Sequence, residues 1–307
     1  MTQRTGELFD LGYQHYDGPR EGRARARKAV FFDGFRTTLG LGRGAGAKVL
    51  PILLFGAAMA PAVILALIAS LSEGQLDLPG HPEYYQIVSI VLLIFAAIIA
   101  PELLCPDRRN GVLNLYLVRP MSIGDYVAAR WLAFFAITLL LVYSGQLVLL
   151  AGLVLSASNP ADYVQDNWLD LPRILGAGFL LAAFITTLPL AVAAFTDRRA
   201  IAAAFVIGIF IISTATAGAL TECHEPPIRD DGSRCEPVTG DAAKWLTMVD
   251  VTRVPTNVNN MIFDTESGDT RDQLVEELPK IVPVGWYIIL TGGLATALWL
   301  RYRRLAA

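Results

Sequence analysis

Six long apolar runs constrain this chain more than any other feature of its sequence. A hydrocarbon layer needs about 20 apolar residues in a helix to cross it, and lipid offers no partner to a free backbone amide, so each run must be helical. A large soluble helical core is the alternative, but 17% charged residues is well below the roughly 25% of soluble domains. We expect spans at about 49–71, 86–105, 131–155, 174–195, 200–220 and 281–300.

Lys and Arg are unevenly divided among the connecting segments, which predicts the orientation. Residues 1–48 carry nine of them, whereas 72–85 and 157–172 carry none and hold three acids each. Short loops rich in Lys and Arg stay in the cytoplasm. We therefore expect both termini in the cytoplasm and residues 221–280 outside. The net charge of −3 gives no indication of nucleic-acid binding.

The stretch GLGRGAGAKV, residues 40–49, nearly matches two nucleotide-binding fingerprints. Both fingerprints require a buried strand before the loop and a soluble helix after it. Here a membrane span follows, Ala47 replaces the second P-loop glycine, and Val49 replaces the magnesium-binding hydroxyl. We expect Lys48 to anchor the chain at the headgroups, and we expect no ATP or metal cofactor in this chain.

The residues before that stretch suggest a short interfacial helix. AVFFDGFRTTLG, residues 29–40, places three phenylalanines within little more than one turn, beside Arg27, Lys28 and Arg36. Rings at the acyl boundary and cations at the headgroups suit an amphipathic helix; a bend in a disordered tail is the alternative. The expected organisation is a cytoplasmic tail (1–28), an amphipathic elbow helix with a Gly-rich hinge (29–48) and a six-helix membrane domain (49–307).

The segment between the second and third spans carries the most specific pattern. In PELLCPDRRNGVLNLYLVRPMSIGDYVAARW, residues 101–131, we expect a turn at Pro106–Asp107, then a short helix that ends at Arg119–Pro120. Ser122 or Asp125 should start the next helix. A compact helix between two spans is suited to contact with a soluble partner, although its arginines also fit ordinary positive-inside residues.

This segment resembles the loop between the second and third helices of ABC-2 type transporter permeases. LGYQHYDGPR, residues 11–20, is similar to the opening of many bacterial permeases of this kind, and 29–40 resembles their elbow helix. The matching residues in the loop are Glu102, Asp107, Arg108, Arg109, Gly111, Leu113, Arg119, Pro120, Ser122, Asp125 and Tyr126.

The resemblance implies an all-α membrane subunit of an ATP-driven transporter, usually an exporter, in a bacterial plasma membrane. Two permeases, identical or homologous, pair with two cytosolic ATPase subunits, which hold the ATP and Mg²⁺. The loop after the second helix acts as a coupling helix that seats on the ATPase. The residues expected to dock there are Asp107, Arg108, Arg109, Gly111, Leu113, Arg119 and Pro120.

Polar residues inside the spans are candidates for a transport pathway. They can equally hold helices together, as small and hydroxylated residues do in membranes. The apolar interior favours a hydrophobic or amphipathic substrate. The candidates are Tyr143, Gln146, Thr186, Thr187, Ser213 and Thr214.

Residues 221–280 are too long for a turn and hold Cys223 and Cys235. That compartment permits a disulfide; a metal site and two free thiols are the alternatives. We expect helices at 242–254 and 271–278, which form a small external cap.

Two other classes of protein were weighed. A secondary transporter or channel acting alone would usually show inverted repeats or Gly/Pro-broken helices in matching halves. No convincing repeat is present, although Pro61 and Pro189 interrupt helices. An intramembrane enzyme would need a catalytic constellation such as paired aspartates, and the three histidines lie outside the expected spans.

Overall fold

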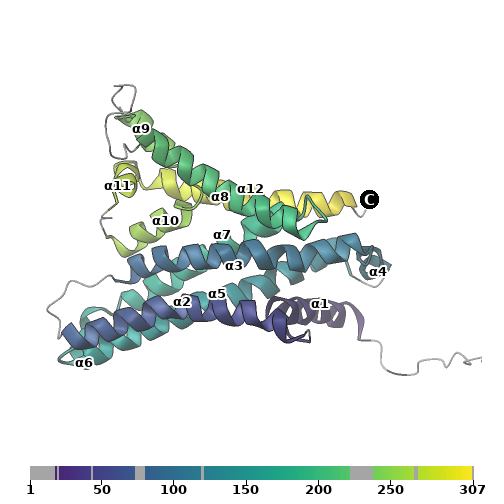
Figure 1. Cartoon of the computed structure of the whole chain (residues 1–307), viewed down its shortest axis with the longest axis horizontal. Coiled ribbons are helices and arrows are strands. Elements are labelled where there is room, and N and C mark those ends of the chain that lie inside the picture. Colours follow the sequence, from purple (N-terminus) through teal and green to yellow (C-terminus); the bar gives the residue numbers. More distant parts are fainter. Residues whose placement is uncertain are drawn as a thin grey trace, which may run out of the picture.

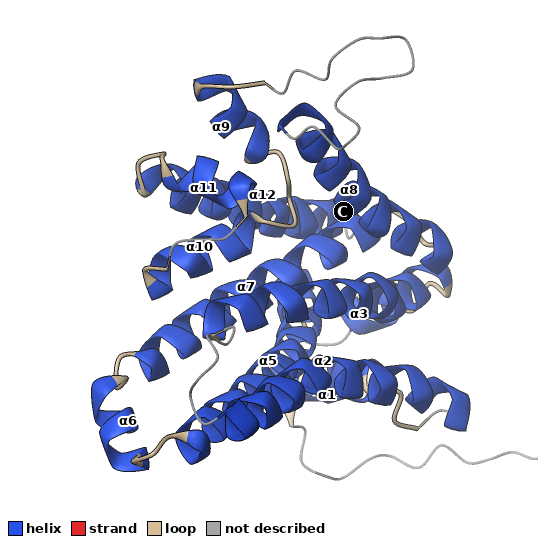
Figure 2. Ribbon diagram, turned by 60° about the vertical axis from the view of Figure 1, so that its left-hand side comes forward, coloured by secondary structure: helices blue, strands red, loops and turns tan. Residues whose placement is uncertain are grey.

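The computed structural model describes residues 18, 21–42, 44–72, 80–118, 121–221, 238–265 and 269–305, and all regular structure within them is helical (Figures 1 and 2). The helices are α1 (Gly22–Thr38), α2 (Ala45–Ser72), α3 (His81–Arg109), α4 (Leu113–Val118), α5 (Ile123–Ser156), α6 (Pro160–Asp166), α7 (Asp170–Ala193), α8 (Arg199–Thr221), α9 (Asp241–Thr247), α10 (Val254–Phe263), α11 (Thr270–Glu276) and α12 (Ile281–Leu305).

The six predicted spans are confirmed as six helices long and apolar enough to cross a membrane. They are Pro51–Leu71 within α2, and α3, α5, α7, α8 and α12. Three of them start at least four residues earlier than predicted, α3 at His81, α5 at Ile123 and α7 at Asp170. The start of α5 follows a local signal, because Ser122 caps it and exchanges hydrogen bonds with Asp125 in a capping box.

The predicted turn at Pro106–Asp107 is wrong, because α3 continues to Arg109. A proline so near a helix end removes only one backbone bond, and α3 is held by packing on α5 and α7. The helix ends instead in a Schellman motif, with Gly111 at φ 65°. The amide of Gly111 donates to Arg108 O at 3.2 Å, and that of Val112 to Asp107 O at 3.0 Å.

The helix predicted near 29–40 is present but longer, since α1 begins at Gly22, inside the segment assigned to the tail. It ends in a second Schellman motif, in which Gly40 at φ 66° donates to Thr37 O at 3.1 Å. The amide of Leu41 donates to Arg36 O at 2.8 Å. The first glycine of the nucleotide-like stretch therefore terminates a helix.

Helix α5 is the centre of the half of the bundle shown lowest in Figure 1, where it packs on α1, α2 and α7. Two glycines permit this close approach. A Cβ added at Gly152 would lie 2.2 Å from Ala66 Cβ, and one at Gly145 would overlap the Tyr84 hydroxyl. Small residues at helix contacts let membrane helices pack by van der Waals contact.

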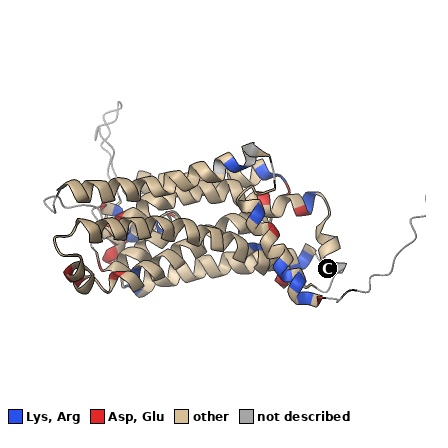
Figure 3. Ribbon diagram, turned by 90° about the horizontal axis from the view of Figure 1, so that it is seen from below, with Lys and Arg blue, Asp and Glu red and all other residues tan. Residues whose placement is uncertain are grey.

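Charged residues lie mainly at the two ends of the bundle. Lys and Arg gather around α1, the α3–α4 connection and the C-terminal helix end (Figure 3). We call this the basic end. The opposite end carries α6, α9, α10 and α11 (Figure 1). Helices α9 and α11 overlap the two predicted helices of the external cap, although α9 ends at Thr247 and not at 254. Helices α10 and α6 were not predicted.

Candidate functional site

Arg130 is the structural centre of the basic end. Its side chain is 3% exposed, and it donates to Asp107 at 2.7 Å and to Asp33 at 2.8 Å. Tyr126 donates its hydroxyl to the same Asp107 carboxylate at 2.7 Å. A buried cation with one partner removed would leave an uncompensated charge. These contacts therefore join α1, α3 and α5 at one residue.

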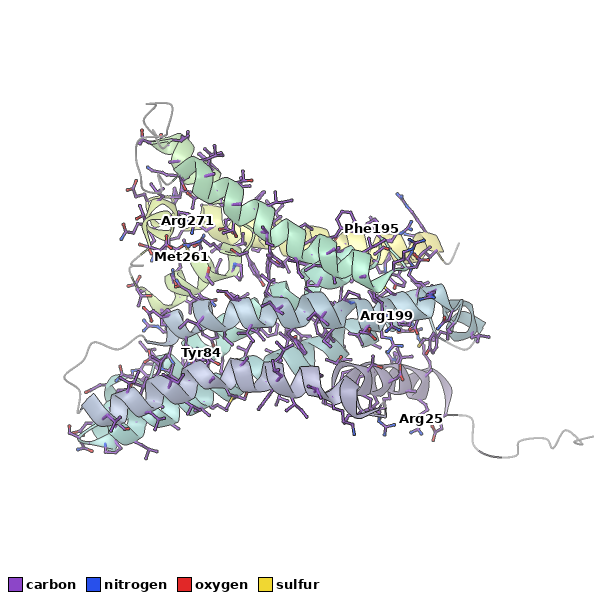
Figure 4. All side chains as sticks on the ribbon, in the orientation of Figure 1. Arg25, Tyr84, Phe195, Arg199, Met261 and Arg271 are labelled. Atoms are coloured by element: carbon purple, nitrogen blue, oxygen red, sulfur yellow. The ribbon has the colours of Figure 1, made fainter. Side chains whose placement is uncertain are left out.

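Arg108 joins α3 to the end of α7. Its guanidinium donates to Thr196 O at 3.0 Å and also to Ala194 O. Backbone carbonyls at a helix C-terminus lack helical partners, and a basic side chain can satisfy them. Arg199 at the start of α8 donates to Glu102 of α3 at 2.5 Å, and Figure 4 shows Arg199 at this end. The arginines thus link helix ends.

Helix α1 has its own contacts with the start of α5. Arg23 donates to Asp125 at 2.6 Å and to Ser122 at 3.1 Å. The hydrogen bond that Arg23 donates to the Asp125 carboxylate raises the pKa of Arg23. Gly34 faces Ala133, and an added Cβ would lie 3.0 Å from that methyl. The predicted elbow is therefore packed along a span as well as basic on its outer side.

The predicted docking residues divide into inward and outward groups. Asp107 and Arg108 make the contacts above, and Leu113 is buried. Arg109 and Gly111 are exposed, and so is Leu115, with 66% of its surface accessible. Arg119 and Pro120 lie outside the described residues. The exposed group forms a small surface at the turn between α3 and α4, which we call the α3–α4 surface (Arg109, Asn110, Gly111 and Leu115).

The predicted pathway residues in α5 and α7 have partners inside the protein. Gln146 is fully buried, its Oε1 accepts from His81 Nδ1 at 2.7 Å, and its Nε2 donates to His81 O at 3.1 Å. Tyr143 donates to Leu175 O at 2.7 Å. Thr187 accepts from the Trp131 indole at 3.0 Å, and Thr186 lies 3.5 Å from Thr138. These contacts hold helices together.

The two candidates in α8 lie beneath the cap. Ser213 accepts from the amide of Val251 at 3.3 Å. Thr214 donates to Asp250 at 2.9 Å. Thr214 also lines a cavity of about 750 Å³ between α3, α8 and the segment that leads into α10.

That cavity has apolar walls and a polar outer end. A volume of this size is within the range of small-molecule sites, about 300–1,000 Å³. Its polar lining includes Gln86 and Ser89 of α3, which the sequence reasoning did not select, although both are polar positions near the start of a span. Its apolar walls are Ile87, Ile90, Leu93, Phe210, Ile211 and Ala215, and its remaining polar lining is Thr252, Arg253, Thr256 and Asp272.

A cluster of ion pairs holds the cap together. Arg253 donates to Asp272 at 2.7 Å and to Asp269 at 2.6 Å, and its Nε lies 3.6 Å from Asp250. Burial by itself would raise the pKa of Asp269, but the hydrogen bond from Arg253 leaves that pKa below its ordinary value. Arg271, labelled in Figure 4, also lies 3.5 Å from Asp250.

Helix α10 is the largest feature of the cap that the sequence reasoning missed. It packs on α3, α7 and α12 and buries Asn257, Asn259 and Asn260. Within the described residues, Asn257 Oδ1 and Asn260 Nδ2 have no hydrogen-bond partner. The signal available was the helical spacing of Val254, Val258 and Ile262, four residues apart, although asparagines lie between them.

The cysteines cannot be compared with their prediction, because Cys223 and Cys235 lie outside the described residues. Cys105 is a buried thiol whose Sγ donates to Thr196 O at 3.4 Å. Among the described residues, no group of three or more His, Cys, Asp or Glu side chains is arranged to hold a metal ion.

Six membrane-length helices with a charged, helix-joining end define a multi-pass integral membrane protein. Residues 12–266 match the model of the ABC-2 family transporter protein family. This match covers most of the chain, so the chain belongs to the ABC-2 family of transporter proteins and is a membrane permease of the ABC transporter type. No curated protein matches the sequence.

Proposed function

We propose that the chain is the membrane subunit of an ATP-binding cassette exporter. It works with a second permease, identical or homologous, and with two cytosolic ATPase subunits that bind the ATP and Mg²⁺. The basic end faces the cytoplasm of a bacterial cell, because segments rich in Lys and Arg remain on that side. Both termini then lie in the cytoplasm and the cap lies outside.

The position of the α3–α4 surface is the main support for coupling between an ATPase subunit and the membrane helices. Arg109 and Leu115 are exposed, while Asp107, two residues before Arg109, is held by the buried Arg130. A partner that displaces the turn therefore moves the end of α3 together with α1 and α5. Arg108 extends the same movement to the end of α7. Rigid elements with shared contacts are the physical means by which one site moves another.

The cavity beneath the cap is our candidate for the outer part of the pathway. Its apolar walls come from the two spans α3 and α8, and its polar end lies at Arg253 and Asp272. A site of this kind suits an amphipathic molecule, with its apolar part between the spans and its polar part toward the cap. Of the six predicted pathway residues, Thr214 lines this cavity. Four of the others form hydrogen bonds between helices, and Ser213 accepts from the backbone of the cap.

The test is to purify the chain from its native host in mild detergent and identify its partners. A stoichiometric soluble protein with an intact P-loop, and ATP hydrolysis by the complex, is the expected result. A chain that purifies alone and transports under an ion gradient in liposomes would overturn the proposal in favour of a secondary transporter or channel.

Variants of the α3–α4 surface sharpen this test. The double variant Arg109→Ala, Leu115→Ala should keep the folded yield but lose the ATPase subunit during purification. The matched control is Arg304→Ala, which removes an exposed arginine at the same end of the bundle. Equal recovery of the ATPase with both variants would place the contact elsewhere.

A further inference from the structure

A narrow apolar groove lies beside the turn that joins α1 to α2. Its volume is about 330 Å³, and it is lined by residues of that turn and of α2, α3 and α5. Phe95, Ile137 and Leu141 are buried and form its floor. Its other lining residues are Leu39, Leu41, Lys48, Pro51, Ile52, Phe55 and Leu140.

The rim of the groove faces the surroundings of the bundle. Ile52 is 69% exposed and Leu140 is 54% exposed. Helices α2 and α5 pack tightly farther along, where Gly152 meets Ala66. Near the basic end the same two helices form opposite sides of the groove. In a membrane, an exposed apolar rim at this position is in contact with acyl chains.

The polar part of the groove is a cation. Lys48 is exposed and lies within one helical turn of Pro51, where the span begins. Its ammonium is therefore at the depth of the headgroups. Arg36 lies one helical turn before Leu39, and neither Lys48 nor Arg36 forms an ion pair with any acid in the described part of the chain.

Other basic residues on α1 add to the positive charge beside the groove. Arg36 shares a surface concavity with Arg25 and Lys28, and these three cations outnumber the one acid of its lining, Asp33. The local field beside the groove is thus positive. Each such cation favours an anionic headgroup by about fivefold.

From this geometry we infer that the groove is a binding site for one anionic phospholipid of the leaflet at the basic end. One acyl chain lies on Phe95, Ile137 and Leu141, and the phosphate lies at Lys48. A bound lipid would fill the space between the α1–α2 turn and α5, and so support the packing of α1. This site is distinct from the cavity beneath the cap and does not depend on which partner drives transport.

The test uses the full chain in phosphatidylcholine nanodiscs with a small fraction of phosphatidylglycerol that carries a photoactivatable diazirine in its acyl chain. Peptide mass spectrometry should find crosslinks in the peptides that contain Ile52 to Phe55 and Ile137 to Leu141. Excess unlabelled phosphatidylglycerol should remove these crosslinks, and excess phosphatidylcholine should not. Equal competition by the two lipids would overturn the preference for an anionic headgroup.

Two variants and two matched controls locate the site. Lys48→Gln should reduce the crosslinks about fivefold. The control is Lys280→Gln, which changes an exposed lysine at the opposite end and should leave the crosslinks unchanged.

Leu140→Trp should fill the groove and abolish the crosslinks. Leu147→Trp is seven residues along the same helix and is equally exposed, but it lies outside the groove. Equal effects of the two tryptophans, or uniform labelling around the bundle, would contradict the site. Lys48→Gln keeps the test decisive if Leu140→Trp folds poorly.

Discussion

The two ends of the bundle use ion pairs for different purposes. At the basic end, Arg130 joins three helices that are far apart in the sequence, and it does so from a buried position. At the opposite end, Arg253 pairs with acids of its own segment, between residues 250 and 272. The first arrangement ties spans to one another, and the second ties the cap mainly to itself.

This difference indicates how a conformational change would divide the molecule. The basic end should move as one body, because α1, α3 and α5 share a single buried cation. The cap meets the spans through hydrogen bonds such as Thr214 with Asp250 and Gln86 with Asp272. It can therefore remain folded while α3 and α8 shift beneath it. Four predictions test or refine this comparison.

The largest effect should come from Arg130→Met. Removing one partner of a buried ion pair costs about 3–5 kcal/mol, because Asp107 and Asp33 are left without their cation. The midpoint of thermal unfolding in detergent should fall sharply, and folded yield should drop. The control is Arg109→Ala, an exposed arginine, for which little change is expected. A stable Arg130→Met protein would show that the basic end is held by packing alone.

Arg253→Gln should have an intermediate and local effect. Charge-assisted hydrogen bonds contribute about 1.5–3 kcal/mol each. Without Arg253, the half-exposed Asp269 can regain water. The buried Asp250 and Asp272 keep Arg271 and Gln86 as partners. Hydrogen exchange should quicken in residues 250–276 and stay unchanged in α1 and α5. Faster hydrogen exchange at the basic end as well would show that the cap and the spans unfold as one cooperative unit.

The cap should also respond to acid through Asp269. Because its folded pKa is below the unfolded value, the stability that it contributes is full above pH of about 4 and is lost as pH falls through the folded pKa. The protection of α11 amides against exchange, relative to their intrinsic rates at the same pH, should therefore fall at low pH before that of α5 amides does. Asp269→Asn should remove this part of the pH dependence; an unchanged profile in that variant would assign it to another acid.

The smallest effect should follow Arg23→Gln. Arg23 is mostly exposed, so its pair with Asp125 is screened by water and salt. The unfolding midpoint should fall slightly at low ionic strength and match the wild type at about 1 M salt. A fall in the unfolding midpoint as large as that of Arg130→Met would mean that the start of α1 contributes as much to stability as its buried middle.

Local and compositional signals determined much of the fold in advance. The six spans follow from apolar length, because lipid permits only helices there. The start of α5 follows from Ser122 and Asp125, which satisfy each other's backbone groups within one turn. The family resemblance of residues 101–131 likewise rests on a contiguous pattern, and the match over residues 12–266 confirms the family.

Tertiary contacts decided what the sequence could not. The sequence predicted Asp107 and Arg108 as docking residues but not their contacts with Arg130 and with the carbonyls at the end of α7. Helix α10 was missed because an asparagine-rich segment forms a helix only where other spans surround it. Apolar length and capping act within one segment and are readable from it, whereas burial of a charge or an amide depends on partners that folding brings from elsewhere.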